Sequence, residues 1–165
     1  MIRSARNFAI KYHADQKYGV FPYSRHLDSV AKIVEPWGEQ AVQVAYLHDV
    51  VEDTDATIAE IEDHFGKFVA DCVQILTDEP GADRAERKKR TNHKLSLVQP
   101  DLFIALVVKA ADRLSNLTAC VNQNHTEKLA MYVAEHEQFR QSAYRAGLCE
   151  SLWREMDELL QSCLT

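Results

Sequence analysis

The sequence predicts an all-α protein, a single compact helical domain of about eight to ten helices covering residues 1–165. Apolar residues recur at three- and four-residue spacing along most of the chain, which is the period of an amphipathic helix. Only five glycines and four prolines occur, and they fall between these periodic segments, where helices end. No internal repeat or linker divides the chain, and 46% hydrophobic residues suffice for one core.

In the first half of the chain, the periodic segments are separated by short breaks. Pro36 should end the second helix, because proline cannot continue the backbone hydrogen bonding. Thr57 and Glu60 fit a capping box that opens a short helix, and Gly66 should end it. The turn expected after the next helix is built on Pro80-Gly81, and YGVFPY at 18–23 is predicted to be a loop. The predicted helices cover residues 2–17, 24–35, 39–51, about 57–66 and 66–77.

In the second half, a strongly basic helix is predicted over 84–94, where the sequence reads RAERKKRTNHK. The apolar run that starts at Leu102 is also compatible with a buried strand. We favour a helix because helical spacing continues to Leu117, and Asp101 is a suitable N-cap after Pro100. Two or three more amphipathic helices are expected from about 126 to 163, with a break near Gly147.

Composition and charge exclude some classes of function. A net charge of −6 argues against a general nucleic-acid binder, and no apolar run is long enough to span a membrane. The four cysteines are far apart and form no CxxC pair, so we expect small buried hydrophobes in a reducing, cytoplasmic setting. They are Cys72, Cys120, Cys149 and Cys163.

The segment YLHDVVEDT at 46–54 sets four polar side chains among apolar ones: His48, Asp49, Glu52 and Asp53. On a helix, residues four apart lie one above the other, so all four can face one cavity. Singly, each is most simply a helix cap or a satisfied core group. Together they would bury neighbouring carboxylates, which is costly unless a cation compensates. The segment therefore predicts a metal site.

Two further segments offer ligands from similar apolar surroundings. His26 lies in PYSRHLDSV, and Asp112 ends the most hydrophobic stretch of the chain. Asn116 is one helical turn after Asp112, and Lys109 is one turn before it. Two imidazoles and two carboxylates would form a mixed nitrogen and oxygen site that suits Mn²⁺, Fe²⁺ or Zn²⁺.

The order H…HD…D, realised as His26, His48-Asp49 and Asp112, resembles the HD-domain superfamily of metal-dependent phosphohydrolases. HDVVEDTDAT, HFGKFVADCVQILTD, ERKKR and VVKAADRLSNL are similar to the hydrolase domain of the RelA/SpoT family, especially its small stand-alone alarmone hydrolases. The likeness runs from about Phe8 to about Phe139. It implies an HD-type helical fold and hydrolysis of guanosine tetraphosphate to GDP and pyrophosphate.

The resemblance also implies roles for individual residues. His26, His48, Asp49 and Asp112 match the family's metal ligands, which typically hold manganese. Glu52 and Asp53 match an acidic pair that orients the attacking water and handles protons. The residues that match or look similar to substrate contacts are Lys11, Arg87, Lys88, Asn116, Lys128 and Tyr132. The chain departs from the family pattern at Tyr12, in place of a second basic residue, at Leu27, in place of a proline, and within YGVFPY.

Simpler readings exist for several of these residues. The basic segment is often only a solvated helix face, and Tyr132 is often a core residue. Three functions remain open: alarmone hydrolysis, hydrolysis of another nucleotide such as a nucleoside monophosphate or the 2′-phosphate of NADPH, and nucleotide-binding regulation without turnover. The apolar face of LWREMDELL, at 152–160, packs internally or forms a homodimer. No membrane or nucleic-acid partner is expected.

Overall fold

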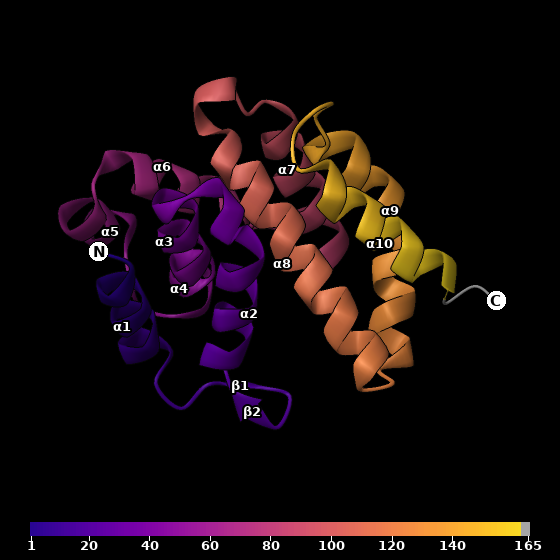
Figure 1. Cartoon of the computed structure of the whole chain (residues 1–165), viewed down its shortest axis with the longest axis horizontal. Coiled ribbons are helices and arrows are strands. Elements are labelled where there is room, and N and C mark those ends of the chain that lie inside the picture. Colours follow the sequence, from indigo (N-terminus) through magenta and orange to yellow (C-terminus); the bar gives the residue numbers. More distant parts are fainter. Residues whose placement is uncertain (163–165) are drawn as a thin grey trace.

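The computed structural model describes residues 1–162, and this part of the chain is almost entirely helical (Figure 1). Two 3₁₀ helices, η1 and η2, and one two-stranded hairpin accompany the α-helices. The all-α prediction is therefore confirmed. The elements are α1 Ile2–His13, β1 Lys17–Tyr18, β2 Phe21–Pro22, α2 Ser24–Val34, η1 Glu35–Trp37, α3 Glu39–Leu47, α4 Val50–Asp53, α5 Ile58–Phe65, α6 Lys67–Leu76, α7 Arg84–Ser96, η2 Pro100–Leu102, α8 Phe103–Asn122, α9 Thr126–Ala143 and α10 Glu150–Ser162.

The long helix α8 is the central element of the fold. It packs against α2, α3 and α6 on one side and against α9 and α10 on the other, as Figure 1 shows. Its residues 105–108 are fully buried, as are Ala110 and Ala111, so the segment has core on nearly all sides. This explains why the sequence there is continuously apolar, and the helical prediction is confirmed.

Two predicted boundaries near the N-terminus are wrong. The first helix ends at His13 rather than at residue 17, because Ala14 takes a left-handed φ of 44° while its N–H still bonds to the Ile10 carbonyl. The predicted loop contains a short antiparallel hairpin in which Lys17 pairs with Pro22 and Tyr18 with Phe21. The hairpin brings the tyrosines of this segment close to α2 and α8.

The helix predicted over 39–51 is also interrupted. The α3 helix ends at Leu47, and α4 begins at Val50. Asp49 lies between them with φ −103° and ψ −6°, although its carbonyl still accepts a hydrogen bond from the Asp53 N–H at 2.9 Å. The break places His48 and Asp49 at the junction of two helices rather than inside one.

Other helix ends follow the predicted signals with one exception. Thr57 and Glu60 form both bonds of the capping box at the start of α5, and Gly66 ends that helix with φ 87°. Asp101, in contrast, is not an N-cap, because it lies inside η2 and α8 begins after Leu102. The chain breaks near Gly147 as predicted, between α9 and α10.

The apolar face of α10 packs inside the chain, since Trp153 and Met156 are buried in the core. Cys72, Cys120 and Cys149 are buried and free, as expected, whereas Cys163 lies outside the described residues. Within residues 1–162 no helix is long and apolar enough to cross a membrane.

Candidate active site

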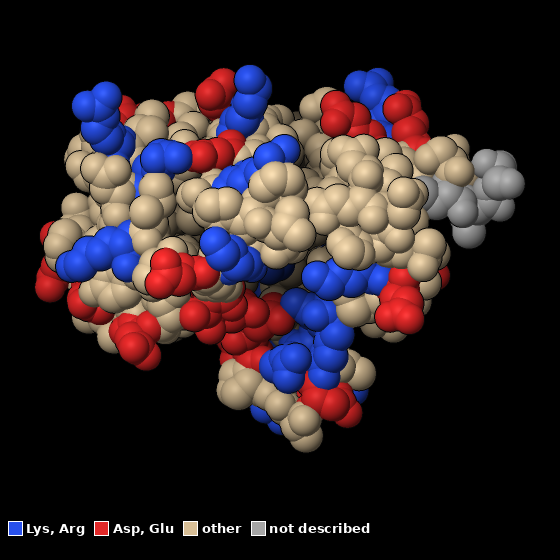
Figure 2. Space-filling model, turned by 90° about the horizontal axis from the view of Figure 1, so that it is seen from below, with Lys and Arg blue, Asp and Glu red and all other residues tan. Residues whose placement is uncertain are grey.

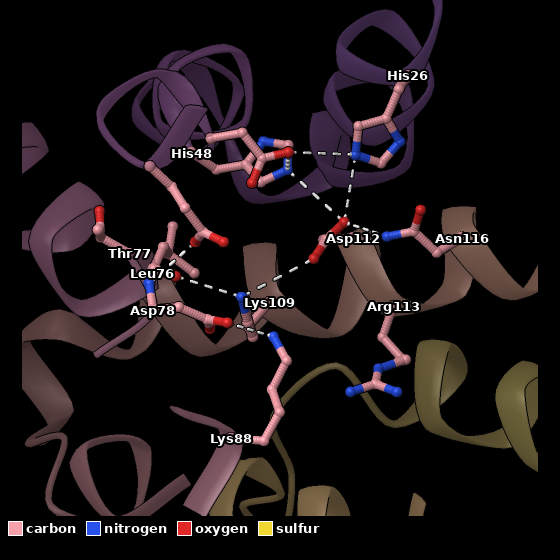
Figure 3. Close-up of polar contacts among 12 residues, drawn as sticks. His26, His48, Leu76, Thr77, Asp78, Lys88, Lys109, Asp112, Arg113 and Asn116 are labelled. Atoms are coloured by element: carbon pink, nitrogen blue, oxygen red, sulfur yellow. Dashed lines mark hydrogen bonds and ion pairs between the residues drawn. The ribbon is translucent and has the colours of Figure 1, made fainter. Parts of the chain in front are cut away.

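Two histidines and two aspartates converge where α2, the α3–α4 junction and α8 meet (Figure 3). The Nε2 atom of His26 lies 3.2 Å from Asp112 Oδ1 and 3.6 Å from Asp49 Oδ2. The Nε2 atom of His48 lies 2.9 Å from Asp49 Oδ2 and 3.6 Å from Asp112 Oδ1. The structure thus brings together the four residues that the sequence singled out as metal ligands.

The imidazole of His48 is oriented as a metal ligand would be. Its Nδ1 donates a hydrogen bond to the Ala45 carbonyl at 2.7 Å, in the tautomer that leaves a lone pair on Nε2. Although Asp49 Oδ2 is only 2.9 Å away, the buried Nε2 makes no hydrogen bond. Since the two atoms do not point at each other, we infer that they face a common point. This donor set fits a divalent cation.

The electrostatics of the cluster also favour a positive charge. Burial lowers the pKa of His48, but the adjacent carboxylates of Asp49 and Asp112 outweigh it and raise that pKa well above its usual value. Although burial opposes ionisation, the two imidazoles hold the pKa of Asp49 and of Asp112 below the usual range. A bound cation would take the place of the proton that the carboxylates attract.

Each carboxylate of the cluster has a neighbouring group that holds it. The Tyr23 hydroxyl donates to Asp49 Oδ2 at 2.6 Å, and the Asn116 amide donates to Asp112 Oδ1 at 2.6 Å. Lys109 Nζ lies 3.9 Å from Asp112 Oδ2 and donates to the Leu76 carbonyl at 3.2 Å. Sequence reasoning missed Tyr23, because nothing in its loop-like segment signals a contact with Asp49.

Glu52 and Asp53 point toward different segments of the chain. The carboxylate of Glu52 accepts a hydrogen bond from the Asp78 N–H at 2.9 Å, and that of Asp53 accepts one from the Gln16 side chain at 2.9 Å. Burial and the nearby charge of Asp78 raise the pKa of Glu52. The expectation of a single helical stripe with His48 and Asp49 is therefore wrong, because the helix breaks and the two carboxylates diverge.

The predicted basic contacts come from three different helices, α1, α7 and α9, and one of them forms an ion pair with an acid. Lys88 Nζ lies 2.5 Å from Asp78 Oδ2, so one carboxylate connects the α7 lysine with the segment that holds Glu52. Arg87 is half-buried on α7, whereas Lys11 is exposed on α1 with its Nζ 5.7 Å from the Tyr12 ring centroid.

Another cation, Arg113, directly follows Asp112 and was not predicted. It lies 3.2 Å from Glu135 and 4.6 Å from the ring centroid of Tyr132, so it connects α8 with α9.

On the face seen in Figure 2, acidic side chains gather near the middle, with Lys and Arg side chains beside them.

A cavity of about 260 Å³ contains three of the predicted substrate contacts: Asn116, Lys128 and Tyr132. Tyr18 and Tyr23 line it as well, and Tyr23 connects it to the histidine and aspartate cluster through Asp49. A larger cavity, about 810 Å³, lies between α6, α7 and η2 and is lined by none of the predicted site residues. The cluster of His26, His48, Asp49 and Asp112 therefore lies beside the smaller cavity.

Comparison with known proteins gives a matching family model, curated relatives and a similar solved structure. The model of the HD domain family matches residues 5–147. The guanosine-3′,5′-bis(diphosphate) 3′-pyrophosphohydrolase MESH1 of Danio rerio is 39% identical over 119 residues, which cover 67% of this chain and 64% of that protein. The Homo sapiens protein of the same name is 36% identical over 121 residues, with 68% and 65% covered. The match thus spans slightly under two thirds of these relatives.

A solved structure extends the likeness over nearly the whole fold. It is described as a metazoan ortholog of SpoT that hydrolyzes ppGpp and plays a role in starvation responses. It superimposes with a TM-score of 0.84 and 25% sequence identity, over 98% of this chain and 94% of that one. The arrangement of helices around the cluster is therefore shared with a hydrolase of known structure.

Proposed function

This chain belongs to the HD domain family, and on that premise we propose that it hydrolyses guanosine tetraphosphate to GDP and pyrophosphate in a metal-dependent reaction. The observation that carries the proposal is the convergence of His26, His48, Asp49 and Asp112, with nitrogen to oxygen distances of 2.9 to 3.6 Å. The names of the MESH1 relatives and of the superimposed hydrolase support the choice of substrate.

An HD domain implies a divalent metal ion, and we propose that these four residues hold it. Manganese is our choice among Mn²⁺, Fe²⁺ and Zn²⁺, all of which accept imidazole and carboxylate ligands. When bound, such an ion neutralises charge on the phosphoryl group and makes water a stronger acid. The protein's own contribution is orientation: Ala45 fixes the His48 ring, while Tyr23 and Asn116 fix the two carboxylates.

Glu52 is the proposed general base or acid. Its pKa is raised toward neutral pH, which suits a group that both accepts and returns a proton. The Asp78 N–H holds its carboxylate in place. Asp53, which is more exposed, is proposed to orient water together with Gln16, to which it is hydrogen-bonded.

The basic residues are proposed to bind the phosphates outside the metal ligand set. Lys88 and Arg87 on α7 and Lys128 on α9 offer positive charge, and Lys11 adds one from α1. Asn116 and Tyr132 line the cavity beside the cluster and are proposed to contact the nucleoside. A substrate phosphate would compete with Asp78 for Lys88, because the two are already paired.

A second candidate is hydrolysis of another nucleotide at the same metal site. One observation favours it: Tyr12, which replaces a basic residue of the family pattern, uses its hydroxyl to bond Glu60 at 2.7 Å. Leu27, which replaces a proline, is fully buried in the core. We propose that these two departures alter nucleoside recognition and leave the proposed metal ligands unchanged. Regulation without turnover is less favoured, because Glu52 and the ligands are all retained.

The test is release of phosphate and pyrophosphate from a nucleotide panel that contains guanosine tetraphosphate, a nucleoside monophosphate and NADPH. We expect pyrophosphate release from the alarmone with added manganese and none with chelator. Cleavage of another nucleotide alone would replace the proposed substrate and retain the metal site. Tight nucleotide binding without any turnover would favour the regulator.

Two further proposals concern the setting. The chain is proposed to act in the cytoplasm and to need no nucleic acid. A homodimer would have to use a surface other than the apolar face of α10, since that face is buried within the chain. Size-exclusion chromatography with light scattering measures the oligomeric state directly.

A further inference from the structure

Tyr18, on the first strand of the hairpin, touches the candidate site at two points and has no role assigned so far. Its ring stacks on His26, with centroids 4.7 Å apart and planes inclined by 15°. Its hydroxyl donates to Asn116 Oδ1 at 2.7 Å. One side chain therefore contacts both a proposed metal ligand and a proposed substrate contact.

Two hydrogen bonds in series connect Tyr18, through Asn116, with the proposed metal ligand Asp112. Asn116 accepts from Tyr18 with Oδ1 and donates from Nδ2 to Asp112 Oδ1 at 2.6 Å. Burial raises the pKa of the Tyr18 phenol, so the group remains a donor at neutral pH. The amide of Asn116 is thus held at both ends, and what it presents to a bound nucleotide depends on Tyr18.

Tyr18 also limits the space beside the cluster. It lines the 260 Å³ cavity together with Asn116, Lys128 and Tyr132. Ligand cavities typically have about 300 to 1,000 Å³, so this one is small and its walls decide what fits. The hairpin turn is held close to α8, because a Cβ added at Gly19 would lie 3.2 Å from the Gln123 side chain.

The chemistry of the walls indicates what part of a substrate enters. The rings of Tyr18, Tyr23 and Tyr132 offer flat apolar surfaces of the kind on which a nucleobase stacks. Lysines contribute the only formal charges, since no aspartate or glutamate lines the cavity within the described residues. This differs from the acidic cluster next to it, and it suits the nucleoside part of an anionic nucleotide.

We propose that Tyr18 is a specificity-determining residue, whose ring bounds the nucleoside cavity and whose hydroxyl holds Asn116 in place for binding. The proposal rests on the proposed function for its ligand class, a nucleotide. It adds a residue of β1 to a site whose proposed metal ligands come from α2, the α3–α4 junction and α8.

Two variants separate the ring from the hydroxyl. Tyr18→Phe keeps the ring and removes one hydrogen bond, and a net hydrogen bond contributes about 0.5 to 1.5 kcal/mol. We expect KM for the preferred nucleotide to rise about threefold to tenfold, with kcat within about twofold of wild type. Tyr18→Ala opens the cavity, and we expect the ratio of kcat/KM between preferred and other nucleotides to fall about tenfold. Val20→Ala is the matched control, because Val20 is 85% exposed at the tip of the same hairpin.

The experiment measures turnover and, separately, nucleotide binding by titration calorimetry, with circular dichroism and manganese content as checks on each variant. If Tyr18→Ala loses manganese or fold, Tyr18→Phe alone decides. An unchanged KM and an unchanged binding constant in Tyr18→Phe overturn the proposal. If wild type binds nucleotides without turnover, the proposed function fails, and the binding ratios of the variants still decide the role of Tyr18. Wild type that binds none of the panel overturns both.

Discussion

One side of the candidate site consists of the buried proposed metal ligands, and the other consists of ion pairs that are partly exposed. The side chains of His26 and His48 are at most 1% exposed, and the core on α2, α3 and α8 fixes them. On the other side, Lys88 is 22% exposed and Arg84 is 40% exposed, and each is held by a carboxylate. We expect a substrate phosphate to take the place of such a carboxylate, whereas the proposed metal ligands are fixed by the core and have no substitute. We therefore expect the first side to control kcat and the second to control KM.

The largest expected effect tests the buried side. Asp112→Ala removes the oxygen that lies 3.2 Å from His26 Nε2. A metal ion contributes several kcal/mol to phosphoryl transfer, and each 1.36 kcal/mol is a factor of ten, so turnover should fall about 1,000- to 10,000-fold. Metal content, measured by mass spectrometry, should fall with it. The control is Asp101→Ala, an exposed aspartate in η2. Full turnover in Asp112→Ala would remove this residue from the ligand set.

The next effect separates proton transfer from metal binding. Glu52→Gln retains the size of the side chain and removes its basicity, so kcat should fall about 100- to 1,000-fold. Manganese affinity should stay within about twofold, because Glu52 is hydrogen-bonded to Asp78 rather than placed among the ligands. Glu62→Gln, on the exposed face of α5, is the control. A kcat equal to that of wild type would show that another group transfers the proton.

A smaller effect tests the accessible side. Lys88→Ala should raise KM for the nucleotide about threefold to tenfold and leave kcat within about twofold, because a charged hydrogen bond to phosphate contributes about 1 kcal/mol after screening. The difference from wild type should shrink at high salt. Lys89→Ala is the matched control, since Lys89 lines the larger cavity instead. If kcat falls and KM is unchanged, Lys88 contributes to turnover rather than to substrate binding, which contradicts the proposed roles of the two sides.

The smallest effect concerns Asp78, which connects the two sides. As the proposed base, Glu52 would act only when ionised. Burial and the negative charge of Asp78 raise its pKa, so turnover should begin to fall at a higher pH than for an ordinary glutamate. Asp78→Asn removes that negative charge and should move this acidic limb of the kcat profile to lower pH, by up to about one unit. Lys109 and Asp49 also act on Glu52 and remain in this variant.

The control for the Asp78 variant is Lys88→Ala, which breaks the same ion pair without removing the carboxylate. We expect its acidic limb to lie at or above that of wild type. A limb that moves equally in both variants would assign the shift to the loss of the ion pair rather than to the charge of Asp78.

The sequence was informative wherever a residue's surroundings follow from helical periodicity. His26 and Asp112 lie in apolar stretches, so their helices were predictable, and the burial of His26 and His48 followed from their apolar neighbours. Their convergence followed from the family resemblance, because spacing alone cannot bring residues 26 and 112 together. The break at Asp49 was not predictable, since neither glycine nor proline marks it.

The hairpin was the main feature beyond the reach of sequence reasoning. Its strands have two residues each, too few for an alternating pattern, and Ala14 ends α1 in a conformation that alanine rarely adopts. Tyr18 reaches Asn116 across 98 positions of sequence. Contacts of this kind depend on tertiary packing, and no local signal in YGVFPY reports them.

The position of the cluster also has a consequence for the chain as a whole. The four proposed ligands come from α2, the α3–α4 junction and α8, so a bound ion would act as a cross-link between distant parts of the polypeptide. An ion that binds only the folded chain stabilises it by RT ln(1 + [M]/Kd), about 2.7 kcal/mol at one hundred times Kd. The concentration of free metal would then determine the lifetime of the protein against proteolysis as well as its rate of turnover.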